Sequence, residues 1–450
     1  MNTRDLDQLI QKLETRTARV GIIGLGYAGL PLAVAFAEAG FSVVGIDLQE
    51  SRVNAINASE SYIGDIPTER IAPLVAERRL RASTDYAALA DIDAVTICVP
   101  TPLTEDKGPD PSAVAAAARS LQPWLRAGQV IVLESTSFPG TTEEILLPVV
   151  EATGLKVGEE IFVAFAPERV NPGDTKYGTR NTPKLVGGVT PACSAAATAL
   201  YSTIINEVSS VSSPRVAEMA KLMENTFRQI NIAFANEMAI VCERLGIDVW
   251  EATAAAATKP FGYLPFYPGP GLGGPCIPVV PHYLAWKSRQ LGYEPRLIGL
   301  ADEVNEAMPG YVVDLTERAL AAQGVDLAGA NVLMLGITYK ADVSDTRVSP
   351  PMQILELLRE RGANAHYHDP LVPHFAIGET NAESATLDAS ALQAADAVLI
   401  ATDHGSFDWE WVVRNARLVI DTRNATARVD AELRATTPIV RLGTPLGEGC

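Results

Sequence analysis

Short apolar runs alternate with amphipathic segments over the first half of the chain, which is the pattern of a parallel α/β sheet. After a leading helix predicted over 5–14, runs of four to six mainly apolar residues predict buried strands, and the segments between them predict crossover helices. A shorter run predicts one more strand, and the first domain is expected to cover residues 1–212. The predicted strands are 18–23, 41–46, 94–99, 130–133, 161–165 and 184–188.

Near Pro214 the pattern changes to one long helical run that reaches Leu245. A helix of this length in a linking position commonly buries an apolar stripe against another helix or a second subunit, so we expect self-association through it. Further helices are predicted from Tyr283 and over 297–323, in a small helical domain of residues 213–325. The apolar stripe consists of Met219, Leu222, Met223, Thr226, Ile230, Ala233, Phe234 and Met238.

The strand–helix alternation restarts in the last third and predicts a second parallel α/β domain, residues 326–450. It lacks a glycine-rich turn after its first strand. The sequence therefore predicts an α/β protein with two Rossmann-like, doubly wound parallel-sheet domains joined by a long central helix and a small helical domain. The predicted elements are strands 331–337, 365–368, 397–401 and 418–421, with helices over 351–361 and around Ser390.

The first predicted strand leads into a dinucleotide-binding fingerprint. Gly24 makes the tight turn, Gly26 lets a pyrophosphate approach the backbone, and Gly29 allows close packing of helix on strand. The helix N-terminus faces the phosphates. Asp47 ends the second strand, where a carboxylate accepts from both ribose hydroxyls and repels a 2′-phosphate. The pattern predicts binding of NAD and disfavours NADP.

Other predicted strands end in polar residues, at the edge where open α/β sheets bind their ligands. One strand runs into Val99, Pro100 and Thr101, the next into Ser135 and Thr136, and a third into Glu168 and Arg169. Two interpretations of Glu168 stay open at this point: a surface charge or salt bridge to Arg169, and a functional carboxylate.

The stretch from Pro268 to Pro281 is predicted to be a loop, because glycines and prolines crowd around Cys276. Its thiol is either an inert buried group or a reactive one. On the long helix, Lys221, Asn225 and Arg228 fall on one face. These residues form either a solvent-exposed polar edge or a set of hydrogen-bond donors directed into a cleft. Their spacing along the helix does not distinguish the two interpretations.

Composition restricts the classes of function. The 450 residues carry a net charge of −18, which disfavours nucleic acids and anionic membranes as partners. The N-terminus is unlike a signal peptide, and no apolar run reaches membrane-spanning length. The five cysteines and five histidines show no metal-ligand spacing. Dispersed cysteines fit a reducing compartment, so a cytoplasmic location is expected.

Motifs spread over nearly the whole chain resemble the UDP-glucose/GDP-mannose dehydrogenase family. They are GLGYAGLP, ICVPTP, ESTSFPGTT, APERVNPG, AKLMENTF, GPGLGGPCIP and GITYKADVSDTR, in the order of the family. The segments around the cysteine loop and ENTFRQINIAFANE are similar to the branch that oxidises UDP-N-acetylhexosamines at C6, the UDP-N-acetylglucosamine 6-dehydrogenases.

The resemblance implies a two-step NAD-dependent oxidation of a primary alcohol to a carboxylate. It implies that Cys276 is the nucleophile and that Lys221 and Asn225 stabilise the developing oxyanion. It also implies that Glu168 transfers a proton during hydrolysis of the thioester. Thr136 is implied to order water and contact the cofactor. Further implied cofactor contacts are Tyr27, Ala28, Arg52, Val99, Pro100, Thr101 and Arg347, and implied UDP-sugar contacts are Arg169, Val170, Arg228, Phe266, Tyr267, Gly273 and Lys340.

The chain departs from the family pattern beside the cysteine. Val280 stands where the family carries Asp, and Pro275 stands where this branch usually carries His. Valine cannot accept a proton or a hydrogen bond. Two alternatives to complete oxidation therefore remain: an altered or incomplete reaction that stops at the aldehyde level or uses another nucleotide sugar, and a catalytically silent subunit that binds sugar nucleotides.

Overall fold

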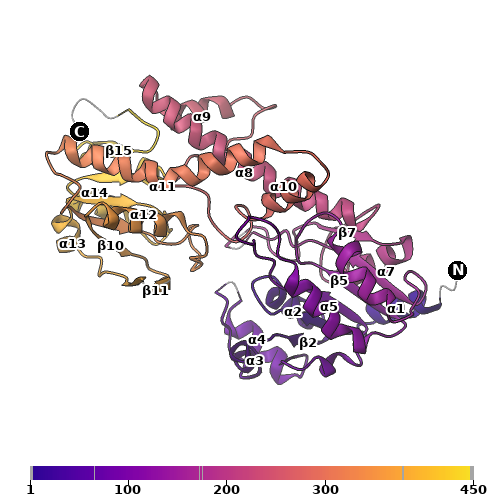
Figure 1. The fold of residues 1–450 in the computed structure, drawn as a ribbon. Helices are drawn as coiled ribbons and strands as arrows, with labels where there is room; N and C mark the ends of the chain where they lie inside the picture. Colours follow the sequence, from indigo (N-terminus) through magenta and orange to yellow (C-terminus); the bar gives the residue numbers. More distant parts are fainter. Residues whose placement is uncertain (1–3, 65, 172, 175, 378–379, 446–450) are drawn as a thin grey trace. The chain divides into compact units, whose positions relative to one another are not determined.

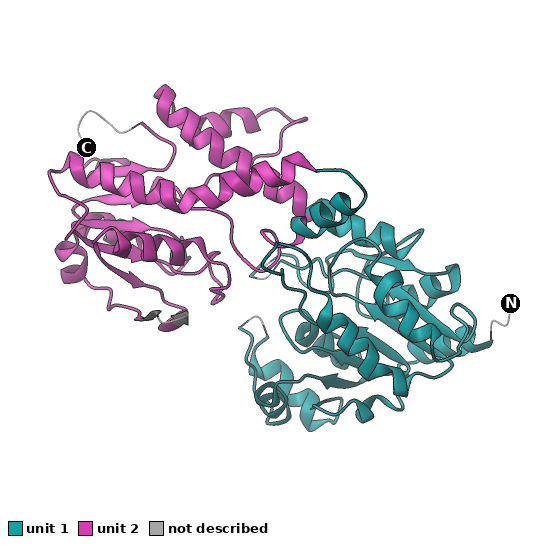
Figure 2. Ribbon diagram, viewed as in Figure 1, with its two compact units in different colours: residues 1–224, 282–294 teal, residues 225–281, 295–450 magenta. Residues whose placement is uncertain are grey.

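The computed structural model describes residues 4–64, 66–171, 173–174, 176–377 and 380–445. The chain forms two compact units (Figure 2): Met1–Glu224 with His282–Glu294, and Asn225–Pro281 with Pro295–Cys450. Two helices, α8 (Pro214–Leu245) and α10 (Val280–Gln290), each contribute residues to both units.

The first unit is built on an eight-stranded sheet with strand order β3-β2-β1-β4-β5-β6-β7-β8. Neighbouring strands pair in parallel except β6 and β7, which are antiparallel. The strands are β1 (Arg19–Ile23), β2 (Ser42–Ile46), β3 (Leu80–Ser83), β4 (Ala94–Ile97), β5 (Gln129–Leu133), β6 (Ile161–Phe165), β7 (Lys184–Gly188) and β8 (Val208–Val211). The order reverses between β1 and β4, the point at which doubly wound sheets bind ligands.

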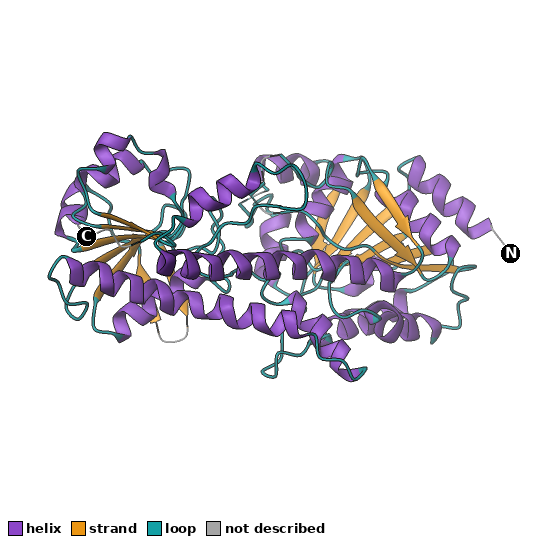
Figure 3. Ribbon diagram, turned by 90° about the horizontal axis from the view of Figure 1, so that it is seen from above, coloured by secondary structure: helices purple, strands orange, loops and turns teal. Residues whose placement is uncertain are grey.

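Helices lie on the faces of this sheet (Figures 1 and 3). They are α1 (Arg4–Glu14), α2 (Gly29–Glu38), α3 (Glu50–Asn57), α4 (Thr68–Ala76), α5 (Ser112–Leu121), α6 (Leu147–Glu151) and α7 (Pro191–Tyr201). Short 3₁₀ turns occur at η1 (Tyr86–Leu89) and η2 (Gln122–Trp124), and a π-helical turn, η3 (Thr142–Leu146), leads into α6.

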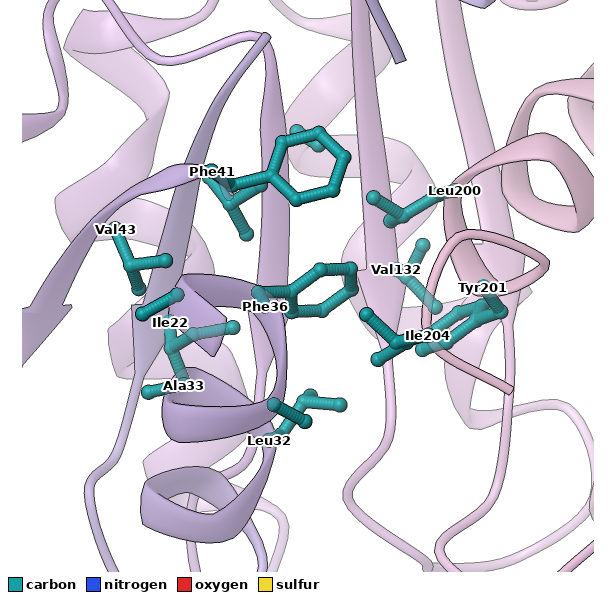
Figure 4. Packing of buried hydrophobic residues seen from close by; sticks show 14 of the residues in the cluster. Ile22, Leu32, Ala33, Phe36, Phe41, Val43, Val132, Leu200, Tyr201 and Ile204 are labelled. Atoms are coloured by element: carbon teal, nitrogen blue, oxygen red, sulfur yellow. The ribbon is translucent and has the colours of Figure 1, made fainter. Parts of the chain in front are cut away.

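An aromatic cluster fills one face of the first sheet (Figure 4). The Phe36 ring of α2 lies edge-on to Phe41 at a centroid distance of 5.7 Å, and 6.3 Å from the ring of Tyr201. Ile22 and Val132 close the cluster from the strands, and all five side chains are buried. The apolar strand residues thus find their partners on α2 and α7, which is why the alternating pattern was sufficient to predict this layer.

The second unit contains a five-stranded, fully parallel sheet with order β10-β9-β13-β14-β15. Its strands are β9 (Asn331–Leu335), β10 (Asn364–His368), β13 (Ala397–Ile400), β14 (Val419–Asp421) and β15 (Ile439–Arg441), and a separate hairpin joins β11 (His374–Ile377) to β12 (Thr380–Glu383). Its helices are α9 (Val249–Ala257), α11 (Arg296–Ala322), α12 (Pro350–Glu360), α13 (Ala389–Ala394), α14 (Trp409–Asn415) and α15 (Ala431–Arg434), with a 3₁₀ turn η4 (Ala425–Arg428).

Within the second unit, α8 and α11 run side by side (Figure 3). Asn236 donates to Asn305 Oδ1 at 2.9 Å, and Asn305 donates to the carbonyl of Gln229 at 3.3 Å. Farther along, Tyr311 donates to Glu243 at 2.5 Å. These buried amides fix the register of the two helices, because an unmatched amide in the interior is costly.

The predicted fold class is confirmed, and two details are corrected. α10 begins at Val280 instead of near Tyr283, so the end of the cysteine stretch is helical, since proline at the second helical position costs no hydrogen bond. Of the apolar stripe expected on α8, Leu222 is buried within this chain and Met223 and Phe234 are more than half exposed, so burial of the stripe against a second subunit stays a prediction. The edge strands β3, β8 and β15 were not predicted, because short edge strands carry too few apolar residues to stand out.

Within the described residues, no helix has the length and apolar character needed to cross a membrane. Neither do the described residues gather three or more His, Cys, Asp or Glu side chains in a metal-binding arrangement. Cys450 lies outside the described residues. The domain boundaries expected at 212/213 and 325/326 stay predictions.

Candidate active site

The glycine turn after β1 has the geometry of a phosphate cradle. Gly24 adopts a φ of +92°, and a Cβ added there would come 2.5 Å from the carbonyl oxygen of Cys98. A Cβ at Gly29 would overlap the carbonyl of Gly24. At Gly26, by contrast, an added Cβ would meet no heavy atom of the described chain within 4 Å. Two glycines are therefore needed for packing, and the third leaves open space for a ligand.

The start of α2 supplies the donors for that space. Its first residue is Gly29, and the preceding Ala28 provides no side-chain cap. The first N–H groups of a helix lack intrahelical acceptors and carry a partial positive charge, so they suit a pyrophosphate. Tyr27 is 44% exposed at the same turn. The residues present fit the pyrophosphate of a dinucleotide.

Asp47, the carboxylate predicted to face the ribose, is held in place from three sides. Its Oδ2 accepts from the Leu25 N–H at 2.9 Å and from Arg52 at 3.2 Å, while its Oδ1 accepts from the Gln49 N–H at 2.9 Å. The Arg52 guanidinium also lies 5.8 Å from the centroid of the Tyr62 ring. Burial, and after it the charge of Asp47, raises the pKa of the Tyr62 hydroxyl.

The carboxyl ends of β4 and β5 meet through hydrogen bonds. Thr101 donates to the carbonyl of Thr136 at 2.6 Å, and Ser135 donates to the carbonyl of Ile97 at 3.3 Å. The Tyr283 hydroxyl of α10 donates to the carbonyl of Thr101. Val99 and Pro100 lie in the same turn. These bonds bring the predicted residues of two strands to the cofactor edge of the first sheet.

Glu168 follows β6 and is mostly buried. Its Oε1 accepts from the N–H groups of Arg169 and Val170 at 2.8 and 2.6 Å, and its Oε2 lies 3.5 Å from the Nζ of Lys184. Burial alone would raise the pKa of Glu168, but Lys184, the Val170 N–H and Lys221 together hold it below its usual value.

The surface-charge interpretation of Glu168 is therefore wrong. The alternative salt bridge to Arg169 does not form either, because the guanidinium of Arg169 pairs with Glu224 at 2.7 Å and donates to the carbonyl of Pro183 at 2.7 Å. Lys184 belongs to no motif and is not predicted from the sequence as a partner of Glu168. The only available signal was a lysine at the first position of an otherwise apolar strand.

In the second unit, the stretch around Cys276 is bound to its surroundings through backbone groups. The Gly269 N–H donates to Asn236 at 2.9 Å, and the Gly274 N–H donates to the carbonyl of Val348 at 3.1 Å. The carbonyl of Cys276 accepts from Val280 N–H at 2.8 Å where α10 begins. The Cys276 side chain is exposed. The backbone is thus restrained while the sulfur stays accessible.

The segment after β9 packs so closely against the glycines of this stretch that it leaves no room for a side chain there. A Cβ at Gly273 would come 2.6 Å from Tyr339 and 2.7 Å from Pro350, and one at Gly274 would come 2.8 Å from the Tyr339 ring. Gly274 also has a φ of +91°. Val348, whose carbonyl accepts from Gly274, has a φ of +47°, which is unusual for a β-branched residue. The hydrogen bond from Gly274 helps to keep Val348 in this strained conformation.

The predicted donors on α8 differ in environment. Asn225 is buried, and its Nδ2 has no hydrogen-bond partner among the described residues, so it is ready to donate to a ligand. Partial burial lowers the pKa of Arg228, whereas the Cys276 and Tyr339 side chains favour its charged form. Arg228 is thus electrostatically coupled to Cys276 within the second unit. Val280, in place of an aspartate, is buried.

The carboxyl ends of β9 and β13 define the ligand edge of the second sheet, because the strand order reverses between them. Thr402 donates to the carbonyl of Thr338 at 2.6 Å, and Thr338 donates to the carbonyl of Lys340 at 2.8 Å. The predicted cation Arg347 pairs with Asp345 through two bonds of 2.9 and 2.7 Å.

The two predicted aromatic contacts pack against helices of the second unit. Phe266 lies edge-on to Phe227 with the ring centroids 5.8 Å apart, and Tyr267 stacks on Trp250 with the centroids 5.8 Å apart.

Arg423, a cation that is not predicted from the sequence, lies next to Gly269 of the cysteine stretch. A Cβ on Gly269 would meet its guanidinium at 2.7 Å. Burial lowers the pKa of Arg423, and its position, far along the chain from any motif used, gave no signal.

Comparison with known families identifies all three parts of the chain. The model described as UDP-glucose/GDP-mannose dehydrogenase family, NAD binding domain, matches residues 18–205. The central-domain model of the same family matches residues 215–307, and its UDP binding domain model matches residues 333–428.

Relatives match over most of their length. The UDP-N-acetyl-D-mannosamine dehydrogenase of Escherichia coli is 37% identical over 87% of this chain and 94% of its own. The UDP-N-acetyl-D-glucosamine 6-dehydrogenase of Pseudomonas aeruginosa is 36% identical over 79% of this chain and 83% of its own. The solved UDP-D-ManNAc dehydrogenase of Pyrococcus horikoshii has a TM-score of 0.84 at 32% identity, covering 94% of this chain and 99% of that one.

The Asp47–Arg52 pair predicts how the cofactor preference can be changed. In Asp47→Ser the carboxylate that repels a 2′-phosphate is gone, while Arg52 remains beside the ring of Tyr62. The ratio of kcat/KM for NADP to that for NAD should rise by about tenfold or more, equivalent to roughly 1.4 kcal/mol. The double variant Asp47→Ser/Arg52→Ala is the control and should lose the gain with NADP. An equal gain in both variants would contradict this role of Arg52.

The packing of Gly274 predicts a second effect. Gly274→Ala places a methyl group against Tyr339 at a positive φ, so strain of roughly 1–3 kcal/mol should displace the cysteine stretch. We expect kcat/KM to fall by about tenfold or more, with the thermal unfolding midpoint little changed. The matched control is Gly299→Ala in α11, where an added Cβ meets no described atom within 4 Å. Equal activity of the two variants would show that the close packing at Gly274 is unimportant.

Proposed function

We propose a substrate and a mechanism for this chain on the premise that it belongs to the UDP-glucose/GDP-mannose dehydrogenase family of NAD-dependent nucleotide-sugar dehydrogenases. The proposed reaction is oxidation of the C6 primary alcohol of a UDP-N-acetylhexosamine to the uronic acid. Relatives of comparable identity are named for UDP-N-acetyl-D-mannosamine and for UDP-N-acetyl-D-glucosamine, which supports this substrate class.

The observation that carries the proposal is the state of Cys276. Its thiol is exposed, its backbone is bound on both sides, and the guanidinium of Arg228 is coupled to it. An inert structural cysteine is usually buried in apolar surroundings instead. The structure therefore favours the reactive interpretation of this cysteine.

In the proposed mechanism Cys276 retains the aldehyde formed by the first oxidation. Its sulfur bonds to the aldehyde carbon and the oxygen gains a proton, which gives a thiohemiacetal. NAD, when bound, accepts one hydride in each of the two oxidations. The second oxidation leaves a thioester on Cys276. Water then attacks the thioester carbon, the carbon–sulfur bond breaks, and the thiolate is regenerated. One alcohol, two NAD and one water thus give one carboxylate, two NADH and three protons.

The remaining roles follow from the chemistry of each group. Lys221 and the unpartnered amide of Asn225 donate to the oxygen on which negative charge develops. Glu168, kept ionised by the charges around it, accepts a proton from the attacking water. Thr136 orders that water and contacts the cofactor.

The proposed ligand contacts are those expected from the sequence, with one addition. Arg423 is added to the cations that hold the nucleotide diphosphate, because its guanidinium lies against the cysteine stretch. For NAD the contacts are Gly24, Gly26, Tyr27, Ala28, Gly29, Asp47, Arg52, Val99, Pro100, Thr101, Thr136 and Arg347. For the UDP-sugar they are Glu168, Arg169, Val170, Lys221, Asn225, Arg228, Phe266, Tyr267, Gly273 and Lys340.

Counting NADH per UDP-sugar consumed tests the function. With a panel of UDP-N-acetylhexosamines and NAD we expect two NADH per sugar and a carboxylate product by mass analysis. Cys276→Ser should lower the rate of carboxylate formation by roughly 10²-fold or more. One NADH per sugar would support arrest at the aldehyde. Stabilisation by UDP-sugar without NADH formation, unchanged in Cys276→Ser, would support the silent binding subunit and overturn the proposal.

Val280 allows a matched gain-of-function comparison in the same assay. It is the first residue of α10, where a carboxylate would be stabilised by the helix N-terminus. If the missing carboxylate limits thioester hydrolysis, Val280→Asp should raise the rate of carboxylate release, whereas the near-isosteric Val280→Thr should not. Equal rates in all three proteins would show that the departure from the family pattern is harmless.

We also propose that the chain self-associates through α8. Phe227, Phe234, Val241 and Leu245 are 39–67% exposed and recur at intervals of seven, seven and four residues, which places them on one face of the helix. An exposed apolar stripe of this kind marks an interaction surface.

A cytoplasmic location is proposed as well, since Cys98, Cys193, Cys242 and Cys276 all carry free thiols.

Light scattering tests the self-association. Phe234→Asp puts a charge in the centre of the stripe and should shift the mass toward the monomer at micromolar concentration, because an unpaired charge is costly in an apolar interface. Leu291→Asp, at a residue that is 80% exposed and off the stripe, is the control and should leave the mass unchanged. A wild-type protein that is monomeric at all concentrations would refute the proposal.

A further inference from the structure

The antiparallel strand β7 brings a lysine to the edge of the sheet where Glu168 lies. Strands β5 and β6 are parallel and end next to each other, so Glu134 and Glu168 follow them on the same edge. Because β7 is antiparallel to β6, its first residue, Lys184, lies at that edge instead of the opposite one. A parallel β7 would have placed the same residue at the far edge of the sheet.

Lys184 is enclosed by partners that fix its position. Its side chain is 4% exposed. The Nζ lies 2.9 Å from Glu134 Oε2 and 3.5 Å from Glu168 Oε2, and 5.0 Å from the centroid of the Tyr201 ring. The Tyr201 hydroxyl donates to the other oxygen of Glu134 at 2.5 Å. Lys184 thus bridges two carboxylates, and Tyr201 fixes the deeper one.

The charges of this cluster depend on one another. Burial raises the pKa of Glu134 despite its pairing with Lys184, whereas Lys184 and the backbone N–H of Val170 hold the pKa of Glu168 low. Burial would lower the pKa of Lys184, but Glu134 and Glu168 raise it, so the lysine stays charged and does not act as a proton relay. Lys221 of α8 also attracts Glu168, and the nearby thiol of Cys98 stays protonated because burial raises its pKa.

We propose that Lys184 is a positioning residue for Glu168: its ammonium, fixed by Glu134 and the Tyr201 ring, holds the Glu168 carboxylate oriented and charged at the end of β6. Without it, the buried Glu134 and the partly exposed Glu168 would face each other with Lys221 as the remaining nearby cation, and one of the two carboxylates would take up a proton. The inference concerns how Glu168 is held, and it rests on the proposed function only for the step that Glu168 serves.

Three variants separate the charge of Lys184 from its volume. Lys184→Met keeps the length and removes the charge, and Lys184→Arg keeps a charge. The double variant Lys184→Met/Glu134→Gln removes the lysine together with the carboxylate that would repel Glu168. A buried ion pair replaced as a pair is often tolerated, so the double variant is expected to fold even if Lys184→Met is destabilised. Thermal unfolding midpoints verify folding of each protein.

The kinetic readout is the pH profile of kcat for NADH formation. Since Glu168 serves as a carboxylate, activity falls as pH drops through its pKa. In Lys184→Met this acid limb should move up by about one pH unit or more, a tenfold change in the protonation equilibrium, with KM for the UDP-sugar little changed. Lys184→Arg should recover much of the shift, whereas the double variant, which loses the attraction of the lysine and the repulsion of Glu134 together, should show a smaller shift in the same direction. An acid limb that does not move in Lys184→Met, or that moves as far in Lys184→Arg, would overturn the proposal.

A second readout does not require activity. Carboxyl ¹³C NMR of protein labelled at glutamate Cδ, with the Glu168 signal assigned from Glu168→Gln, follows the protonation of Glu168 directly. A higher midpoint in Lys184→Met than in the wild type supports the inference even if no UDP-sugar is oxidised, in which case only the proposed function fails. Equal midpoints in folded Lys184→Met and wild type would overturn the inference and leave the proposed function intact. Where Lys184→Met does not fold, the double variant takes its place: a Glu168 midpoint above that of Lys184→Arg supports the inference, and equal midpoints in these two proteins overturn it.

Discussion

The direction of the strands is the constraint on which the rest of the structure depends. Parallel neighbours end at the same edge of a sheet, so the segments that follow β4, β5 and β6 are brought together without any long-range sequence signal. Those segments carry Thr101, Thr136 and Glu168. In the second unit the ends of β9 and β13 meet in the same way, which joins Thr338 to Thr402. Polar side chains gather at these edges because apolar side chains fill the interior of each sheet.

Close backbone packing determines where each unit requires glycine. In the first unit, Gly24 and Gly29 leave no room for a Cβ, while Gly26 faces open space. In the second unit, Gly273 and Gly274 lie against Tyr339, and the Gly274 N–H donates to the carbonyl of the strained Val348. Glycine thus serves two opposite purposes in this chain. It removes volume where backbone meets backbone, and it leaves volume where a phosphate approaches.

Buried charge is balanced locally in a chain whose overall charge is strongly negative. Lys184 lies between two carboxylates, and the guanidinium of Arg169 is taken by Glu224. Arg423, which lies against Gly269 of the cysteine stretch, donates to the carbonyl of Ala401 and interacts with Asp403 and Asp421. The buried cations of the chain are thus each matched by nearby carboxylates or carbonyl groups.

The sequence by itself determined the two α/β domains, the long helix, the glycine turn with Asp47, and Cys276 in its glycine-rich stretch. These features depend on local residue order, since apolar periodicity and glycine spacing are properties of short segments. Only the tertiary structure decided that Glu168 pairs with Lys184 and not with Arg169, and that Arg423 and Tyr339 lie against the cysteine stretch. It also placed Val280 in the first turn of α10. Each of these facts depends on which distant segments share an edge or a surface, and the antiparallel pairing of β7 that brings Lys184 to Glu168 leaves no mark in the residues around either of them.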